Sequence, residues 1–128
     1  MREVLLVAFG GAVGATLRHL VGIAAIRLMG TGFPWGTLTV NIVGSFVMGL
    51  LVATLAKLSP SFGAREVRLF MGVGLLGGFT TFSSFSLDAG NLIEGGQGQT
   101  AAIYVVVSVV FGLIALFAGL GLVRWVAP

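Results

Sequence analysis

GGFTTFSSFS, residues 77–86, is the stretch of this 128-residue sequence that decides its fold. Five of the seven residues from Thr80 to Ser86 carry a hydroxyl group, inside an otherwise apolar segment. Paired glycines followed by two threonines weaken helical propensity, and hydroxyl side chains can satisfy backbone groups that a helix break releases. We therefore expect a helix that is broken near its middle, with carbonyl groups that are free to bind a cation. The alternative is that the hydroxyls only bond to carbonyls of the preceding helical turn.

The composition of the whole chain indicates that this helix lies in a membrane. Hydrophobic residues make up 57% of the chain and charged residues 9%, and the mean hydropathy is +1.11. A soluble domain of this size must cover its surface with polar side chains, so a soluble domain is excluded. The 21 glycines are scattered through apolar runs with only three prolines, which is typical of close helix packing. Cysteine is absent, which excludes a disulfide framework, a thiolate metal site and a cysteine nucleophile.

The charged residues divide the chain into four membrane spans. A bilayer core of about 30 Å requires roughly 20 apolar residues per helix. The spans are therefore predicted at about 4–29, 37–56, 69–87 and 101–123. Turns are expected at 30–34 and 95–98, and a loop with a surface turn at Ser59-Pro60-Ser61 is expected within 57–68. The predicted fold is an all-α membrane protein with a single transmembrane domain over residues 1–128.

The first segment also has features of a secretory signal peptide, because Arg2 precedes an apolar stretch that contains small residues. Arg18 and His19 interrupt the segment where the apolar region of a signal peptide would continue. We therefore interpret residues 4–29 as a membrane span.

Basic residues predict the orientation of the chain. With four spans, both termini and the central loop lie on one side of the membrane, and Arg27 lies on the other. The first side collects Arg2, Lys57, Arg65, Arg68 and Arg124. The positive-inside rule then predicts a multi-pass membrane protein with its termini in the cytoplasm. The net charge of +3 reflects this topology, and since no basic patch with interleaved aromatic residues is present, no nucleic-acid partner is expected.

Small residues spaced one helical turn apart occur in every span. Close approach of helices in lipid depends on such pairs, because lipid provides little hydrophobic drive for association. The pairs are Gly10/Gly14, Gly74/Gly78, Ser45/Gly49, Ser108/Gly112 and Ala115/Gly119. They predict a compact bundle. Four helices can hardly enclose a polar path while one face contacts lipid, so we expect at least two copies of the chain to associate.

Polar residues in three spans predict a shared conduit. Asn41 places an amide in the second span, where an unpaired amide is costly. Tyr104 and Ser108 are four residues apart, so their hydroxyls point the same way. Phe82 and Phe85 share a face if the helix resumes there, and their positive ring edges favour a small anion. Singly these residues would be packing or interhelical contacts, but together they predict a path for an anion that binds only weakly.

At these residues the sequence strongly resembles the Fluc (CrcB-type) fluoride channels. The resemblance covers the whole chain and is most specific at residues 77–86. It includes GATLR at 14–18 and PWGTL at 34–38, which leads to Asn41. It implies passive, fluoride-selective export across the cell (inner) membrane by an antiparallel, dual-topology homodimer with two pores. Such a dimer requires both orientations in the lipid bilayer, although the basic residues favour one.

The resemblance also implies roles for individual residues. The fluoride pore would comprise Asn41, Phe82, Phe85, Thr81, Ser83, Ser84, Tyr104 and Ser108. In that pore the phenylalanines present ring edges and the asparagine an amide donor. Backbone carbonyls of Gly77 and Thr80 would hold a structural Na⁺ ion on the dimer axis, and Arg18 would line a vestibule or make a structural pair. Gly112, one turn beyond Ser108, interrupts the hydroxyl stripe that some relatives continue.

Other classes of function fit the residues less well. A small four-helix drug/proton antiporter is the nearest alternative by size, but it needs a carboxylate within the membrane. Glu3 precedes the first span, whereas Asp88 and Glu94 lie where the third span ends. A purely structural subunit would not need the run of hydroxyls. The chain is not expected to be an enzyme, because His19 is its only histidine and no GxSxG or HExxH motif is present.

Overall fold

The computed structural model describes residues 1–57 and 63–126. Within that part every regular element is a helix. The elements are α1 (Arg2–Met29), α2 (Trp35–Lys57), α3 (Ala64–Val67), η1 (Arg68–Leu76), α4 (Gly77–Phe79), α5 (Phe82–Glu94) and α6 (Gly98–Val126). Four segments are long and apolar enough to cross a membrane: α1, α2, the succession from α3 to α5, and α6. The prediction of an all-helical chain with four membrane-spanning segments is therefore confirmed.

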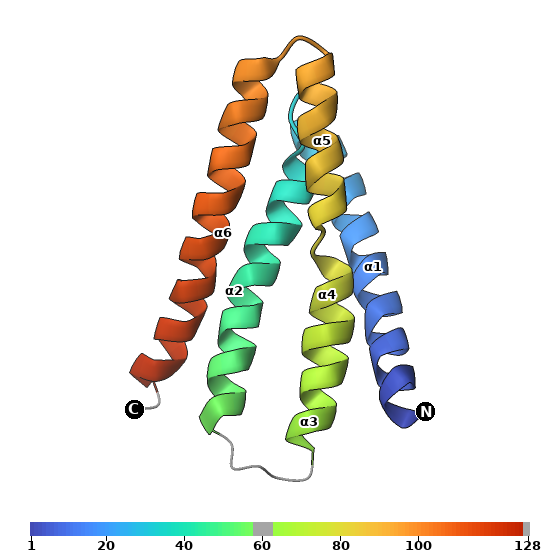
Figure 1. The fold of residues 1–128 in the computed structure, drawn as a ribbon, viewed down its shortest axis with the longest axis vertical. Coiled ribbons are helices and arrows are strands. Elements are labelled where there is room, and N and C mark those ends of the chain that lie inside the picture. Colours follow the sequence, from blue (N-terminus) through green and yellow to red (C-terminus); the bar gives the residue numbers. More distant parts are fainter. Residues whose placement is uncertain (58–62, 127–128) are drawn as a thin grey trace.

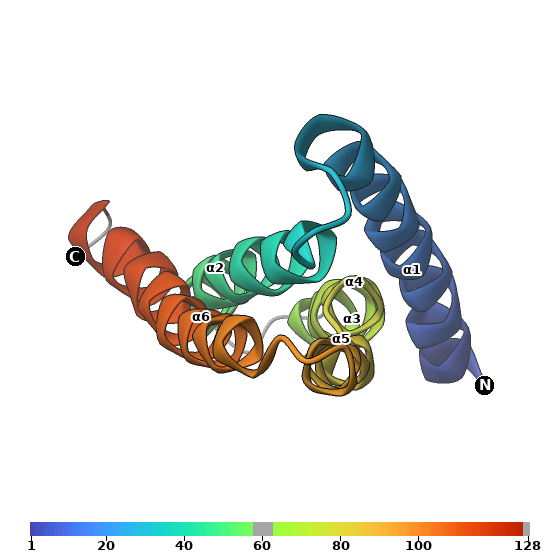
Figure 2. The ribbon, with the colours of Figure 1, turned by 90° about the horizontal axis from the view of Figure 1, so that it is seen from above.

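The four segments form an open arrangement rather than a closed bundle. They stand side by side and splay apart toward the end that carries the N-terminus (Figure 1). α6 packs mainly against α2, and α1 packs mainly against η1 and α4. Seen from above, α1 and α6 lie at opposite ends of the arrangement (Figure 2). One chain thus leaves broad apolar faces uncovered, and these must contact lipid or another protein chain.

One end of the molecule collects most of the basic side chains. The start of α1, the end of α2, the start of α3 and the end of α6 all lie there (Figure 1). Two ion pairs join α1 to α3 at this end: Arg2 Nη1 lies 3.6 Å from Glu66 Oε1, and Arg65 Nη2 lies 2.9 Å from Glu3 Oε1. Both pairs include largely exposed side chains, so each contributes only about 0–1 kcal/mol to stability. These ion pairs therefore contribute little to the stability of the fold.

Two helix boundaries differ from the sequence-based expectation. Residues 65–68 are helical, as part of α3 and η1, although they were expected in a loop. The third segment does not end at Leu87 but continues to Glu94, because a helix pairs its own backbone groups in water as well as in lipid. Gly96, with a φ of +75°, then turns the chain toward α6. The turn expected at Ser59-Pro60-Ser61 lies outside the described residues.

Glycines bring the helices into backbone contact, as the small-residue pairs predicted. A Cβ atom placed on Gly74 would lie 3.0 Å from Gly10 Cα, and one on Gly78 would lie 2.6 Å from the Gly11 carbonyl oxygen. These contacts join α1 to η1 and α4. In the same way, a Cβ on Gly49 would lie 3.2 Å from Gly119 Cα, where α2 meets α6. No larger residue fits at these crossings without moving a helix backbone.

The segment before the break is wound more widely than an α-helix. Residues Arg68–Leu76 form a π-helix, the type of helix whose amides bond carbonyl groups five residues earlier. At its end the Gly77 amide still donates to the Gly72 carbonyl. Wide turns of this kind are rare and occur mostly at functional sites. No feature of the sequence predicted this π-helix.

Candidate functional site

The third segment changes backbone conformation at Thr80 and Thr81. Helix α4 ends at Phe79, Thr80 is extended (φ −81°, ψ 159°), Thr81 is extended (φ −154°, ψ 120°), and α5 begins at Phe82. Asn41, on the neighbouring helix α2, pairs with both backbone groups of Thr81. Its Oδ1 accepts from the Thr81 amide at 2.8 Å and its Nδ2 donates to the Thr81 carbonyl at 3.1 Å. The asparagine thus replaces the backbone partners that an extended residue loses inside lipid.

Hydroxyl groups of this stretch serve two purposes. Those of Thr80 and Ser86 donate to the carbonyl four residues earlier, at 2.9 and 3.0 Å, which is the alternative considered from sequence. Thr81 instead caps helix α5, because its Oγ1 accepts from the Ser84 amide at 3.1 Å. The same oxygen lies 3.1 Å from Ser84 Oγ and 3.3 Å from Ser83 Oγ. Three hydroxyls therefore gather where α5 begins.

Backbone carbonyls that precede α5 lose their helical partners as a result, among them those of Gly77 and Thr80. In a continuous α-helix the Thr81 amide would bond the Gly77 carbonyl, and the Ser84 amide would bond the Thr80 carbonyl. The first amide is bonded to Asn41 and the second to the Thr81 hydroxyl. The carbonyl oxygens of Gly77 and Thr80 are consequently free of these amides. They are the two oxygens at which the family resemblance led us to expect a sodium ion.

Arg18 reaches the same region from α1. Its Nη1 lies 3.5 Å from the Thr80 carbonyl oxygen. The guanidinium borders a cavity of about 300 Å³ that we call the Arg18 pocket, together with His19, Thr37 and Ser84. Within residues 1–57 and 63–126, no group of three or more His, Cys, Asp or Glu side chains is placed to hold a metal ion.

A second cavity, which we call the break cavity, lies beside the extended residues and has a volume of about 420 Å³. All of its lining residues are uncharged. They are Asn41, Gly44, Ser45, Met48, Thr80, Thr81, Phe82, Phe85, Ser108, Val109 and Leu116. Phe82 is 79% exposed although it lines the cavity, so the cavity opens at the surface of the single chain. The Ser108 hydroxyl is buried and has no hydrogen-bond partner among the described residues.

Aromatic rings form one edge of this region. The ring centroids of Phe82 and Phe85 lie 5.5 Å apart, and Phe85 lies 5.3 Å from Tyr104. Phe33, from the connection between α1 and α2, meets Tyr104 edge to face at 5.4 Å. Tyr104 is fully buried. Such tilted and edge-on pairs hold the rings in defined orientations, so their edges are directed rather than mobile.

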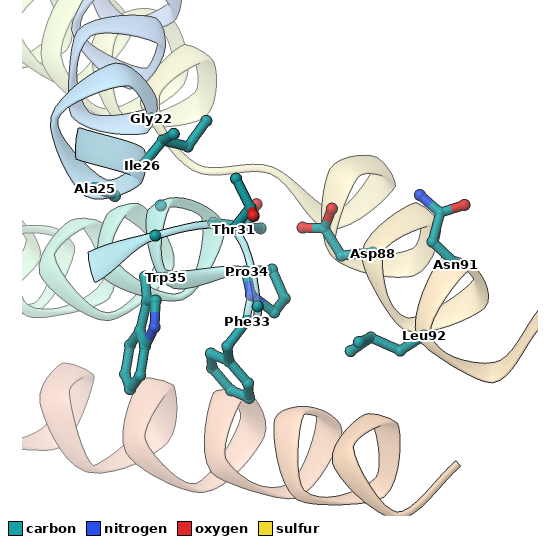
Figure 3. Close-up of a pocket in the computed structure, with 14 residues that line it drawn as sticks. Gly22, Ala25, Ile26, Thr31, Phe33, Pro34, Trp35, Asp88, Asn91 and Leu92 are labelled. Carbon is teal, nitrogen blue, oxygen red and sulfur yellow. The ribbon is translucent and has the colours of Figure 1, made fainter. Parts of the chain in front are cut away.

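A third cavity, the outer pocket, lies at the end of the molecule opposite the N-terminus and has a volume of about 370 Å³. Figure 3 shows Asp88 and Asn91 of α5 on one side of it, with the carboxylate of Asp88 directed toward the connection that carries Thr31 and Pro34. The Tyr104 hydroxyl donates to Asp88 Oδ2 at 3.3 Å. Asp88 thus links the outer pocket to the buried ring of Tyr104.

Comparison with known proteins identifies the family. Over residues 5–120 the sequence matches the family described as CrcB-like protein, Camphor Resistance (CrcB). This chain belongs to the CrcB-like family. The resemblance inferred from residues 77–86 is thereby confirmed.

Relatives of the CrcB-like chain match it over nearly its whole length. The Fluoride-specific ion channel FluC of Agrobacterium fabrum is 54% identical over 125 residues, which are 97% of this chain and 98% of the relative. The protein of that name from Sphingopyxis alaskensis is 55% identical over 124 residues, with 97% of each chain covered. The protein of that name from Rhizobium johnstonii is 50% identical over 128 residues, with 99% and 100% covered.

The structure of the CrcB-like chain brings together only some of the residues predicted for the pore. Those that line the break cavity are Asn41, Thr81, Phe82, Phe85 and Ser108. Ser84 lines the Arg18 pocket, Ser83 lies beside Thr81, and Tyr104 packs behind Phe85. Sequence analysis did not include Ser45 among the pore residues, although it also lines the break cavity. Its spacing of four residues from Asn41 is the signal that would have identified it.

Proposed function

We propose that this CrcB-like protein is a passive, fluoride-selective channel of the cytoplasmic (inner) membrane, which releases fluoride from the cell. Its relatives are named fluoride-specific ion channels, and the protein acts as a channel rather than as an enzyme. The observation that carries the proposal is the break cavity, whose lining residues are uncharged but include an amide, hydroxyls and ring edges. A fixed positive charge would hold fluoride too tightly, whereas these groups replace its water and let it leave.

Several groups in the break cavity can contact an anion directly. The Ser108 hydroxyl is buried and has no partner in the described part of the chain, so its proton is available. Asn41 has two N–H groups on Nδ2, and only one is needed for the Thr81 carbonyl. The edges of Phe82 and Phe85 carry partial positive charge. Fluoride passing between these weak donors would lose its hydration shell in steps.

We further propose that the active unit is an antiparallel homodimer with two pores. The opening of the break cavity at Phe82, which is 79% exposed in one chain, supports a second chain that completes the wall. The open arrangement of the helices supports the same conclusion. Each chain would then contribute one break cavity, and the two cavities would be related by the dimer axis.

A structural sodium ion between the two chains is part of this proposal. The freed carbonyls of Gly77 and Thr80 suit a hard monovalent cation, which binds oxygen donors. Arg18 Nη1 lies 3.5 Å from the Thr80 carbonyl oxygen, which has a second lone pair that can bind sodium. Bound sodium would neutralise the carbonyl dipoles at the break. The expected result is that replacing sodium with a large organic cation lowers the thermal midpoint of the purified dimer, and an unchanged midpoint would contradict the site.

Anion efflux from liposomes that contain the purified protein tests the channel function. Fluoride is expected to leave and chloride to stay. Equal loss of both anions would contradict selectivity for fluoride over chloride. Proton-coupled efflux of an organic cation would instead favour the drug/proton antiporter, for which Asp88, bonded to Tyr104, is the carboxylate nearest the aromatic rings.

A further inference from the structure

Helices α2 and α6 carry three of the polar residues that line the break cavity, namely Asn41, Ser45 and Ser108. The two helices run in the same direction and lie side by side (Figure 1). They touch at Gly49 and Gly119, where a Cβ on either glycine would lie 3.2 Å from the Cα of the other. This close contact fixes which residues stand opposite each other along the pair.

The polar stripe on α6 ends before that crossing. Tyr104, Ser108 and Gly112 follow one another at intervals of four residues and so lie on one face. The first two carry hydroxyls, but Gly112 has no side chain. A conduit lined from α6 alone would therefore stop at Ser108, about one helical turn of 5–6 Å short of position 112.

Ser45 lies where the missing side chain would be. It follows Asn41 by four residues on α2, and both residues line the break cavity. A Cβ placed on Gly112 would have Ser45 Oγ as its neighbour, at 3.8 Å. The hydroxyl on α2 thus projects toward the position that α6 leaves empty.

The Ser108 hydroxyl, unlike that of Thr80 in the same cavity, is not paired with the backbone. Elsewhere in the described residues, Thr16 and Thr54 each donate to the carbonyl four residues earlier at 2.8 Å. The Ser108 hydroxyl is buried without such a bond. An unpaired buried hydroxyl is costly unless something else accepts its proton. The cavity therefore has the character of a binding site at Ser108, and Ser45 lies one turn further along the same wall.

We propose that the Ser45 hydroxyl is an ion-contacting residue of the fluoride path and supplies from α2 the donor that Gly112 does not supply from α6. It extends the line of donors from Asn41 and Ser108 toward the end that carries the termini. The role rests on the proposed channel function, because it needs an anion that moves through the break cavity.

The test is a rescue experiment in liposomes that contain the purified full-length dimer and internal fluoride. Ser45→Ala removes the hydroxyl with little change in volume, and we expect fluoride efflux to fall about tenfold or more. Gly112→Ser in the same chain returns a hydroxyl from the opposite helix, and efflux is expected to recover. Among the described residues, Ser45 Oγ is the only neighbour within 4 Å of a Cβ at position 112, so the added Cβ fits. Gly112→Ala on the Ser45→Ala background adds the Cβ without the hydroxyl and should not rescue.

Two controls separate the possible failures. Thr54→Val removes a hydroxyl from α2 that bonds Leu50 outside the break cavity, and its efflux should equal that of the unmodified protein. Unchanged efflux in Ser45→Ala, or loss that Gly112→Ser does not restore in a protein that still elutes as a dimer, would overturn the role of Ser45 and leave the channel function standing. Absence of fluoride efflux from the unmodified protein would overturn both.

Discussion

The carboxamide of Asn41 pairs with the backbone of Thr81, as a neighbouring strand would in a β-sheet. It accepts from the amide and donates to the carbonyl, at 2.8 and 3.1 Å. Inside a membrane no water is available to take over either group. The remaining N–H of the same carboxamide stays available to an anion. One side chain therefore connects the extended backbone of the break with the chemistry of the proposed path.

Asn41→Leu tests the structural part of this role. The substitution leaves the Thr81 amide and carbonyl unpaired, so we expect a loss of roughly 2–5 kcal/mol in unfolding free energy. Asn41→Asp keeps an acceptor for the Thr81 amide but loses the donor and places an ionisable carboxylate in the membrane, so it should also destabilise the protein. Chemical unfolding in detergent, followed by circular dichroism, measures both variants. Stability within about 0.5 kcal/mol of the unmodified protein would show that the backbone finds other partners.

Phe82 and Phe85 differ in how far their side chains are packed against other residues of the same chain. Phe82 is 79% exposed in one chain, whereas Phe85 lies against Tyr104. Isoleucine keeps bulk but has no quadrupole, so Phe82→Ile and Phe85→Ile are each expected to reduce fluoride efflux about three- to tenfold while the dimer remains intact. Efflux at the unmodified rate, with an unchanged elution volume, would reduce both rings to packing residues.

Helix crossings are the features that matter at the scale of elements. The α1 crossing uses Gly74 and Gly78, which flank the end of the π-helical turn just before the break. The α2–α6 crossing uses Gly49 and Gly119 just below the break cavity. Both crossings depend on backbone contact, which gains dispersion energy only when no side chain intervenes. The position of the broken segment relative to its neighbours is therefore set by glycines.

Gly78→Ala should disturb this arrangement strongly. The new Cβ would lie 2.6 Å from the Gly11 carbonyl oxygen, so α1 must move away. Overpacking of this kind costs about 1–3 kcal/mol, and the thermal midpoint should fall. Gly121→Ala is the matched control, because nothing lies within 4 Å of a Cβ at that position in α6. Equal midpoints for the two variants would mean that the α1 contact does not limit stability.

At the scale of the whole molecule, the distribution of basic residues and the symmetry of the proposed dimer favour different orientations of the chain in the membrane. Basic side chains collect at one end of the chain, which favours a single orientation in the membrane. The proposed antiparallel dimer needs both orientations in equal numbers. The two ion pairs that the described residues form at the basic end both include largely exposed groups. The free energy gained when a second chain covers the open face would therefore have to exceed the free-energy difference between the two orientations in the membrane.

A single-cysteine variant tests dual topology. The natural sequence has no cysteine, so Gln97→Cys, in the connection between α5 and α6, is the sole thiol. In an antiparallel dimer, half of the thiols face each side of the membrane. A membrane-impermeant maleimide added to sealed vesicles should then label about half of the protein, and all of it after detergent is added. Labelling near zero or near completion in sealed vesicles would establish one orientation.

The sequence by itself determined the membrane character, the four spanning segments and the family. These properties depend on hydropathy, on the positions of a few charges and on residues 77–86, which act locally and need no knowledge of what packs against them. The pairs Gly10/Gly14 and Gly74/Gly78 were identified in the same way, since their spacing alone places them on one helix face. Helix ends were less accurate, because the continuation of a helix into water leaves little trace in hydropathy.

Only the tertiary structure decided how the polar residues divide among sites. It paired Asn41 with Thr81, separated Tyr104 from the break cavity, and placed Ser45 opposite Gly112. It also showed the π-helical turn that precedes the break. These features depend on which helices touch and in what register, and that register is set by backbone contacts between glycines far apart in the chain. Such contacts cannot be predicted from the local sequence. A glycine that contacts another helix and a glycine that faces lipid can have the same neighbours in the sequence.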